Sequence, residues 1–246
     1  MQTTHTSQAT QAAQVTQASF NQLVLASDNA GKLHELTALL SPLSIQVIAQ
    51  ADLGVAAAEE TGTTFIENAL IKAKHASALT GLPALADDSG LVVDALHGAP
   101  GVHSARYAGE PKSDSQNNEK LLQAMQHQSN RRAQFVCVLA LCWHHEHPLP
   151  LIASGQWQGE ILTAPSGHHG FGYDPLFYLP ALKRSAATLT TAEKNQYSHR
   201  AIALTQLITQ LNQMPLNQAQ LNQTQSIAGG QGTNDEKISP LGISND

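Results

Sequence analysis

Short apolar runs alternate with helical patterns through the first part of the chain, and this alternation restricts the fold more than any other feature of the sequence. Residues 23–26 and 46–49 are apolar runs of the kind found in buried strands. Between them, Leu33, Leu36 and Leu40 fall on one face of a helix. A strand, a helix and a second strand are therefore expected in that order.

A second helix is expected over residues 64–79, because Thr64 and Glu67 have capping-box spacing. Its predicted buried face consists of Ile66, Ala69, Ala73 and Ala76. The apolar run 83–86 then predicts a strand that ends at the turn-like residues 87–90, with residues 91–96 returning as another strand.

The later part of the chain has a different pattern. Residues 120–125 are expected in a helix, and the long apolar segments 133–143 and 152–162 are expected to pair as a hairpin. A final helix is expected over 193–211. Alternating elements followed by hairpin strands indicate an α/β protein with a mixed sheet.

Both ends of the chain are of low complexity. Residues 1–19 contain no charged side chain, and residues 212–246 are rich in Gln, Asn, Gly and Ser. Such segments bury too little apolar surface to offset their ordering entropy, so both are expected to be disordered tails around a domain at 20–211. The first segment also lacks the basic start and the apolar stretch of a secretory signal.

Composition excludes several classes of function. The net charge of −6 argues against a general nucleic-acid binder, which needs a basic face. No apolar run is long enough to span a bilayer. The chain has only two cysteines, Cys137 and Cys142, which cannot form a disulfide framework, so a reduced, cytoplasmic protein is expected.

The loop after the first expected strand has the features of a phosphate site. Ser27 and Asn29 supply short polar side chains, Asn29 is a natural N-cap, and Lys32 adds a positive charge in the first helical turn. The spacing is not that of a Walker A loop. Taken alone, the pattern fits an ordinary capped helix with a solvated lysine better than a phosphate site.

Carboxylates gather in two further places. Asp87 and Asp88 follow an apolar strand, and adjacent carboxylates are costly to hold together unless a cation neutralises them. Mg²⁺ prefers such oxygen ligands, and Glu60 is a third candidate ligand. Lys72, on the helix that follows, could reach phosphate, whereas Lys74 faces elsewhere. An acidic turn and a charged helix start are the ordinary explanations.

A glycine-rich loop and a basic segment complete the set. Phe171 lies between two glycines, so its ring can offer a face to a base, and Asp174 can accept hydrogen bonds from base N–H groups. His199 and Arg200 can donate to a keto oxygen or a phosphate. Each feature alone also fits a loop packed on the core or a solvated helix, but together they describe a nucleoside triphosphate site without a P-loop.

In this combination the chain resembles the inosine triphosphate pyrophosphatase-like family, the Ham1/RdgB-type dITP/XTP pyrophosphatases. The resemblance covers about residues 23–211. The motifs that carry it are Ser27-x-Asn29-x-x-Lys32, residues 59–62 and 65–69, 86–91, 98–101, 104–107, 170–175 and 198–200.

The resemblance implies a long mixed central sheet, two α/β lobes with a nucleotide cleft between them, and a homodimer. It also implies Mg²⁺-dependent hydrolysis of dITP, ITP or XTP to the monophosphate and pyrophosphate. Asp88 matches the general base, and Glu60, Asp88 and the adjacent Asp87 match the metal site. The residues that match substrate contacts are Ser27, Asp28, Asn29, Ala30, Gly31, Lys32, Lys72, Ser89, Arg106, Phe171, Gly172, Tyr173, Asp174, Lys194, His199 and Arg200.

The sequence also departs from the family pattern. Asp28 would repel phosphate if it faced the substrate, so we expect it to face away or to hold the loop. His103, His168 and His169 replace other residues, and the two histidines at 168 and 169 are expected beside the entrance of the base loop. Two alternatives remain at this point: a Maf-type pyrophosphatase acting on modified pyrimidine nucleotides, and a non-catalytic nucleotide-binding module.

Overall fold

One mixed sheet of seven strands organises the protein, for which the computed structural model describes residues 20–214. The strand order is β2-β1-β3-β4-β5-β6-β7, with β1 parallel to β2 and β3 and all later pairs antiparallel. The strands are β1 (Gln22–Leu25), β2 (Gln46–Ala49), β3 (Ala84–Val93), β4 (Arg132–Cys142), β5 (Leu151–Ile161), β6 (Phe177–Leu179) and β7 (Arg184–Ser185). The predicted α/β class with a mixed sheet is confirmed.

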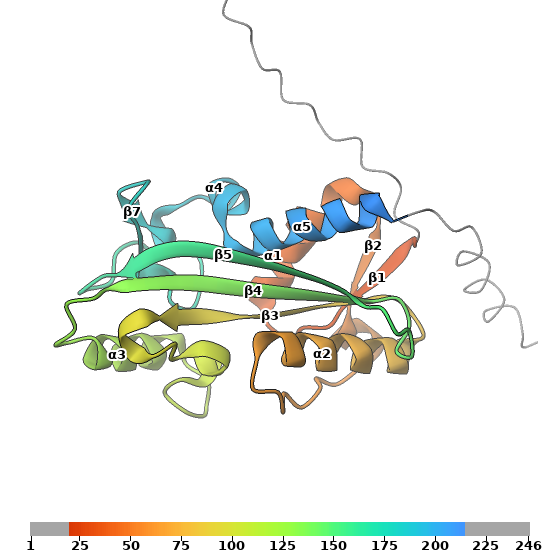
Figure 1. Ribbon diagram of the computed structural model, residues 1–246, viewed down its shortest axis with the longest axis horizontal. Coiled ribbons are helices and arrows are strands. Elements are labelled where there is room, and N and C mark those ends of the chain that lie inside the picture. The colour runs from red at the N-terminus through yellow and green to blue at the C-terminus, as the bar shows by residue number, and fades with distance from the viewer. Residues whose placement is uncertain (1–19, 215–246) are drawn as a thin grey trace, which may run out of the picture. The chain divides into compact units, whose positions relative to one another are not determined.

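Helices cover both faces of this sheet (Figure 1). They are α1 (Ala30–Leu40), α2 (Phe65–Thr80), α3 (Asp114–Ala124), α4 (Thr191–Tyr197) and α5 (His199–Gln213). Figure 1 shows α2 and α3 along one side of the long strands β3–β5, and α4 and α5 along the other. α1 packs with α5, since Leu36 and Leu40 share a buried cluster with Leu204 and Leu207.

Side-chain alternation along β3 divides the core between the two faces. Leu85 points toward α1 and α5, while its neighbours Ala84 and Ala86 point toward the alanines of α2. A further cluster lies around Leu121 of α3 and Phe135 of β4. Each face of the sheet therefore has its own helix layer. The direction in which a β3 side chain points determines which helices it contacts.

Capping side chains begin the helices where the sequence predicts. The Asn29 side chain accepts a hydrogen bond from the Lys32 amide at 2.9 Å, and Thr64 and Glu67 form a reciprocal capping box. Both caps satisfy backbone N–H groups that have no partner inside the helix. The predicted hairpin is also confirmed, as β4 and β5 pair in antiparallel register.

The structure corrects three of the expectations. Residues 87–90 are no turn and residues 91–96 are no separate strand, because β3 is continuous from Ala84 to Val93. The helix expected to include residues 120–125 is α3, which begins at Asp114. The final helix is divided at Ser198, which has an extended backbone and whose side-chain hydroxyl caps α5 by accepting a hydrogen bond from the Ala201 amide. Ile66 is 49% exposed, because it lies away from the buried face that Ala69, Ala73 and Ala76 form against the sheet.

The chain ends lie mostly outside the described residues. α5 continues to Gln213, past the predicted boundary at residue 211, and the predictions for residues 1–19 and 215–246 are not addressed by the structure. Within 20–214, no helix combines the length and apolar character needed to cross a membrane.

Candidate active site

An open edge of the sheet lies where β1 ends. β1 pairs with β3 only at Val24–Ala84 and Leu25–Leu85, so among the strands of residues 20–214 none adjoins β3 on that side from Asp87 onward, and only an isolated bridge links Val92 to Pro100. Ligands of open α/β sheets bind outside the carboxyl ends of parallel strands. The adjacent carboxylates Asp87 and Asp88 therefore lie at the position where the fold favours a site.

The loop from β1 to α1 borders this edge and is held by its own polar side chains. The Ser27 hydroxyl accepts a hydrogen bond from the Asn29 amide at 3.2 Å. Asp28 is turned to Gln50, whose side-chain amide donates to Asp28 Oδ1 at 2.6 Å. This contact fits the expectation that Asp28 holds the loop. Ala30 is exposed at the start of α1.

One ionic cluster lies on the α2 side of β3. Lys72 Nζ contacts Glu60 Oε1 at 2.8 Å and Asp88 Oδ1 at 2.6 Å, and it donates to the Asp87 carbonyl oxygen at 2.9 Å. Arg106 Nη1 lies 3.4 Å from Glu60 Oε2. The predicted carboxylates Glu60 and Asp88 are thus brought together, with Lys72 between them, while Lys74 is exposed as expected.

Asp88 keeps one oxygen without a protein partner. Its Oδ2 is buried and makes no hydrogen bond to any residue in 20–214. Burial, together with the nearby Glu60 charge, raises the pKa of Asp88 despite the opposing effect of Lys72 and Lys32. A buried acceptor without a partner is costly, and a divalent cation is an ordinary way to satisfy it. Glu60 and Asp88 therefore fit a metal site.

Asp87 points to the opposite face and has no free oxygen. Oδ1 contacts Lys32 Nζ at 2.8 Å and accepts from Ser89, and Oδ2 accepts from Arg200 Nε at 2.7 Å and from the Cys137 thiol. Burial disfavours its charged form, but Arg200 and Lys32 outweigh that effect and hold the pKa of Asp87 well below its usual range. In this structure Asp87 therefore anchors two cations, Lys32 and Arg200, and its expected metal role stays a prediction.

Glu35 is a buried acid that the sequence reading missed. It contacts Lys194 Nζ at 2.9 Å and pairs closely with Arg200 through Nη1. Lys194 in turn contacts Asp174 Oδ2 at 2.5 Å. Glu35 thereby joins the start of α5 to the glycine-rich loop. Its position in α1, three residues after Lys32, places it on the same helix face as Lys32, and that spacing is the one signal that could have identified it.

The ring of Phe171 lies between elements that the sequence separates widely. Lys194 Nζ is 4.8 Å from the ring centroid, and the Phe171 amide donates to Asp174 Oδ2 at 2.9 Å. A Cβ on Gly31 would lie 2.7 Å from the ring, so the ring packs directly on the first turn of α1. The aromatic side chain thus adjoins the phosphate-cradle loop.

A pocket with a volume of about 90 Å³ opens beside these groups. It is lined by Asn29, Lys32, Ser89, Gly90, Leu91, Ser104, Ala105, Asp114, Phe135, Phe171, Gly172, Tyr173, Asp174, Lys194, His199 and Arg200. His168 and His169 are not among its lining residues, and their expected effect on the entrance stays a prediction. The pocket joins the Phe171 loop to the open edge of β3.

His199 offers the pocket a polar atom on a flat, buried ring. The ring stacks on Phe135 with a centroid distance of 4.9 Å, and Nδ1 is buried without a partner among the described residues. Burial, with help from the neighbouring cations, holds the pKa of His199 well below its usual value, so the ring is neutral at pH 7. A neutral imidazole has one donor and one acceptor nitrogen.

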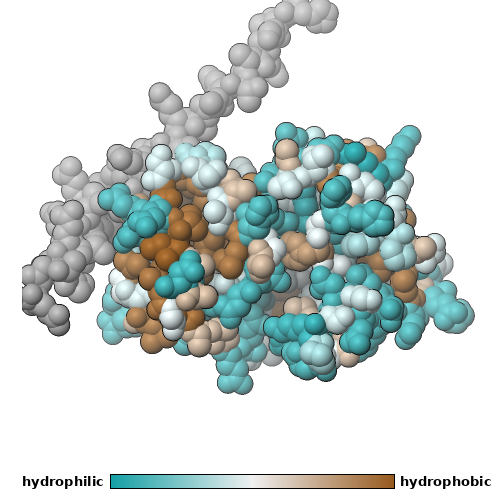
Figure 2. All heavy atoms as spheres, turned by 180° about the vertical axis from the view of Figure 1, so that it is seen from behind, coloured by the Kyte–Doolittle hydropathy of each residue, from teal (hydrophilic) through white to brown (hydrophobic). Residues whose placement is uncertain are grey.

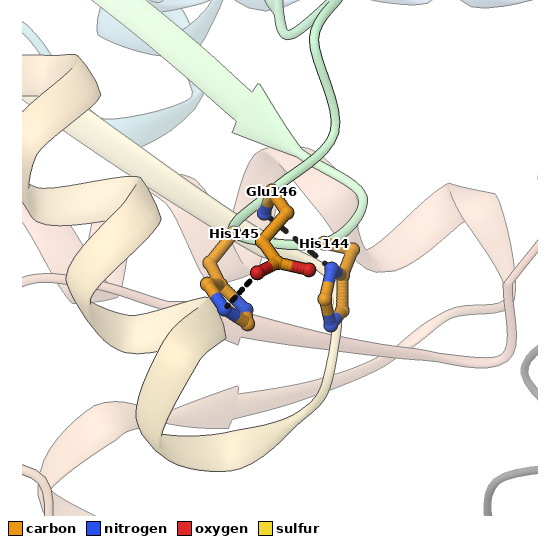
Figure 3. Close-up of side chains that lie close together, drawn as sticks. All are labelled: His144, His145 and Glu146. Atoms are coloured by element: carbon orange, nitrogen blue, oxygen red, sulfur yellow. Dashed lines mark hydrogen bonds and ion pairs between the residues drawn. The ribbon is translucent and has the colours of Figure 1, made fainter.

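A separate group of His144, His145 and Glu146 lies on the turn between β4 and β5 (Figure 3). Its possible ligand atoms lie within 4.8 Å of one another, and His145 Nε2 is 3.8 Å from Glu146 Oε1. None of the three lines the pocket. The candidate site therefore does not include them.

Comparison with known proteins gives consistent matches over this region. The model of the Ham1 family matches residues 23–210. A dITP/XTP pyrophosphatase of Nitrosomonas europaea is 55% identical over 193 residues, which cover 78% of this chain and 95% of that protein. One from Xanthomonas axonopodis pv. citri is 58% identical over 197 residues, with 79% and 99% covered.

Solved structures agree with these matches. A HAM1 protein from Coxiella burnetii has a TM-score of 0.73 at 51% identity and covers 78% of this chain and 99% of its own. The Staphylococcus aureus Ham1 protein has a TM-score of 0.70 at 41% identity, with 78% and 98% covered.

Proposed function

The chain belongs to the Ham1 family, and on this premise we propose that it hydrolyses the non-canonical purine nucleoside triphosphates dITP, ITP and XTP to the monophosphate and pyrophosphate, which cleanses the nucleotide pool. We assign the activity to residues 20–211. The observation that carries the proposal is the junction at Asp87 and Asp88. Asp88 faces the candidate metal cluster, and Asp87 anchors Lys32 and Arg200, which line the pocket beside Phe171.

Glu60 and Asp88 would hold Mg²⁺, which when bound would neutralise charge on the phosphate oxygens. Asp88 is proposed to orient a water molecule toward the α-phosphorus and to accept its proton. Lys32, Lys72 and the N-terminal amides of α1 would balance the charge that builds on the departing pyrophosphate. Arg106, next to Glu60, is placed to support the same charge.

Base selection would depend on donors in the pocket. His199 Nδ1 and the guanidinium of Arg200 are proposed to donate to the 6-keto group of hypoxanthine or xanthine. Arg200 is already tied by Asp87 and Glu35, so its orientation is fixed before the base arrives. Adenine presents an amino group instead, and a buried donor left unpaired costs about 1–3 kcal/mol.

The test is a panel of nucleoside triphosphates assayed for pyrophosphate. We expect rapid Mg²⁺-dependent release from dITP, ITP and XTP, slow release from ATP, and loss of turnover when EDTA removes the metal. Release from a modified UTP in preference to dITP would instead indicate the Maf-type activity. Nucleotide binding without turnover would indicate a non-catalytic module.

Assembly and location extend the proposal. We propose a homodimer, because hydrophobic side chains gather on one half of the face seen in Figure 2, and apolar patches of this kind mark interaction surfaces. Light scattering in solution tests the proposed dimer.

A cytoplasmic location is supported by Cys137 and Cys142, which are both buried free thiols.

Replacing Gly31 with alanine should separate binding from stability. The new methyl group would lie 2.7–2.9 Å from ring atoms of Phe171 and would displace the ring. Alanine favours a helix over glycine by up to about 1 kcal/mol, which offsets part of the cost of moving the ring, so the fold should persist. We expect a higher KM for ITP with a stable fold, measured by steady-state kinetics and thermal unfolding. An unchanged KM would show that the ring position does not matter for binding.

A further inference from the structure

The first turns of α3 hold both backbone polar groups of one glycine in the Phe171 loop. Asp114 Oδ2 accepts a hydrogen bond from the Gly172 amide at 2.7 Å. Asn118 Nδ2 donates to the Gly172 carbonyl oxygen at 2.8 Å. Asp114 and Asn118 lie one helical turn apart on the same face, which is why both reach the same residue.

Helix capping does not account for these two side chains. Ser113 is already the N-cap of α3, with its hydroxyl accepting from the Gln116 amide. Asn118 donates to the Asp114 carbonyl oxygen as well, at 2.9 Å, so its amide nitrogen serves two carbonyls. Its Oδ1 is left buried and without a partner among residues 20–214. The orientation of Asn118 is thus dictated by the two carbonyls that it contacts.

Gly172 directly follows the ring that lies over the pocket. Phe171 packs on Gly31 of α1, and its amide is held by Asp174. The loop is therefore fixed on one side to α1 and on the other to α3. Asp114 and Gly172 both line the pocket, so this second attachment is made at the pocket wall.

We propose that Asp114 and Asn118 are positioning residues that set the place of the Phe171 ring and thereby the strength of purine binding. This inference rests on the proposed function for its substrate class. If it is correct, loss of the hydrogen bonds from Asp114 and Asn118 to Gly172 weakens binding of the base half of the substrate. Hydrolysis and the phosphate half of the site, on α1 and β3, stay intact.

Substitutions at the two positions distinguish positioning from a general effect on the fold. Asp114→Ala and Asn118→Leu each remove one contact to Gly172. Asp114→Asn keeps an oxygen that accepts from the Gly172 amide and serves as the conservative rescue. Ser115→Ala, on the same turn of α3, is the matched control, because the Ser115 hydroxyl donates to Glu119 and not to the Phe171 loop.

The experiment measures binding of IMP and of pyrophosphate by calorimetry, KM and kcat for ITP, and hydrogen exchange of the Gly172 amide. For Asp114→Ala and Asn118→Leu we expect the dissociation constant of IMP and the KM for ITP to rise about tenfold, the usual effect of a lost charge-assisted or buried hydrogen bond. Pyrophosphate binding and kcat should stay at the wild-type level. The Gly172 amide should exchange faster in Asp114→Ala and remain protected in Asp114→Asn and Ser115→Ala.

Wild-type IMP affinity and slow Gly172 exchange in Asp114→Ala would overturn the inference. Equal weakening of IMP and pyrophosphate would also overturn it, because it would indicate a loss of the whole site. If the wild-type protein binds IMP but does not hydrolyse ITP, the proposed function fails, and the IMP and exchange measurements still decide the role of Asp114 and Asn118.

Discussion

Replacing Asp88 with asparagine is expected to lower kcat for dITP by about a thousandfold, within the range for loss of a general base. Asparagine has nearly the same shape but cannot take a proton, and its neutral amide is a poor ligand for a divalent cation. The change removes the one buried carboxylate oxygen at the site that no described residue satisfies. Pyrophosphate release under saturating dITP and Mg²⁺ measures the effect.

The matched control is Asp94→Asn, just beyond the end of β3. Asp94 is exposed and meets only Arg132 Nε at 3.5 Å, so turnover should not change. The fold of Asp88→Asn should also persist, because Lys72 keeps its contact with Glu60. Near-normal turnover by a folded Asp88→Asn protein would refute the assignment of the base.

The sequence was sufficient to predict most elements and most of the groups at the site. Amphipathic spacing and capping residues identified α1 and α2, and the apolar runs identified β1, β2, β4 and β5. Local patterns of this kind can be recognised in the sequence because each depends on residues within one or two helical turns of one another. The same reasoning failed where a distant part of the chain decides the outcome.

Residues 87–90 illustrate that failure. Asp, Ser and Gly are typical turn residues, yet here the segment pairs with residues 136–139 of β4 and continues as a strand. Gly90 is needed because the carbonyl oxygen of Gly101 would lie 2.4 Å from a Cβ, not because the chain turns. A continuous strand also sends Asp87 and Asp88 to opposite faces, which separates roles that the sequence assigned together.

Tertiary pairing explains the other differences. A glutamate at position 35 of a helix is expected on the surface. Its burial is favourable only because Lys194 of α4 and Arg200 of α5 pair with it. The break at Ser198 has a local cap, but an unbroken helix fits the same spacing of apolar residues. Asp88 and Lys32 face different sides of β3 and still lie close to each other, because Asp87, the neighbour of Asp88, contacts Lys32 directly.

Replacing Arg200 with methionine is expected to reduce the free energy of unfolding by about 3–5 kcal/mol at pH 7. Arg200 is 1% exposed and pairs with Asp87 and Glu35, so its removal leaves both carboxylates buried with fewer partners. The same substitution at Arg184, whose pair with Glu193 is more than a third exposed, should cost less than about 1 kcal/mol. Urea unfolding of both variants and the wild type gives the comparison.

The pH dependence of this loss identifies its cause. In the wild type, the pKa of Asp87 is lower in the folded than in the unfolded protein, so ionisation of Asp87 stabilises the fold. This stabilisation is complete above the usual carboxyl pKa, and it is lost as pH falls through the lowered pKa of the folded state. Without Arg200, burial of Asp87 favours its protonated form. Protonation at acid pH therefore removes part of the variant's loss in free energy of unfolding. The stability gap should therefore narrow as pH falls from 7 toward about 4, the ordinary carboxyl pKa. A gap that is constant over this range would mean that Arg200 stabilises the core by packing its side chain, not by its charge.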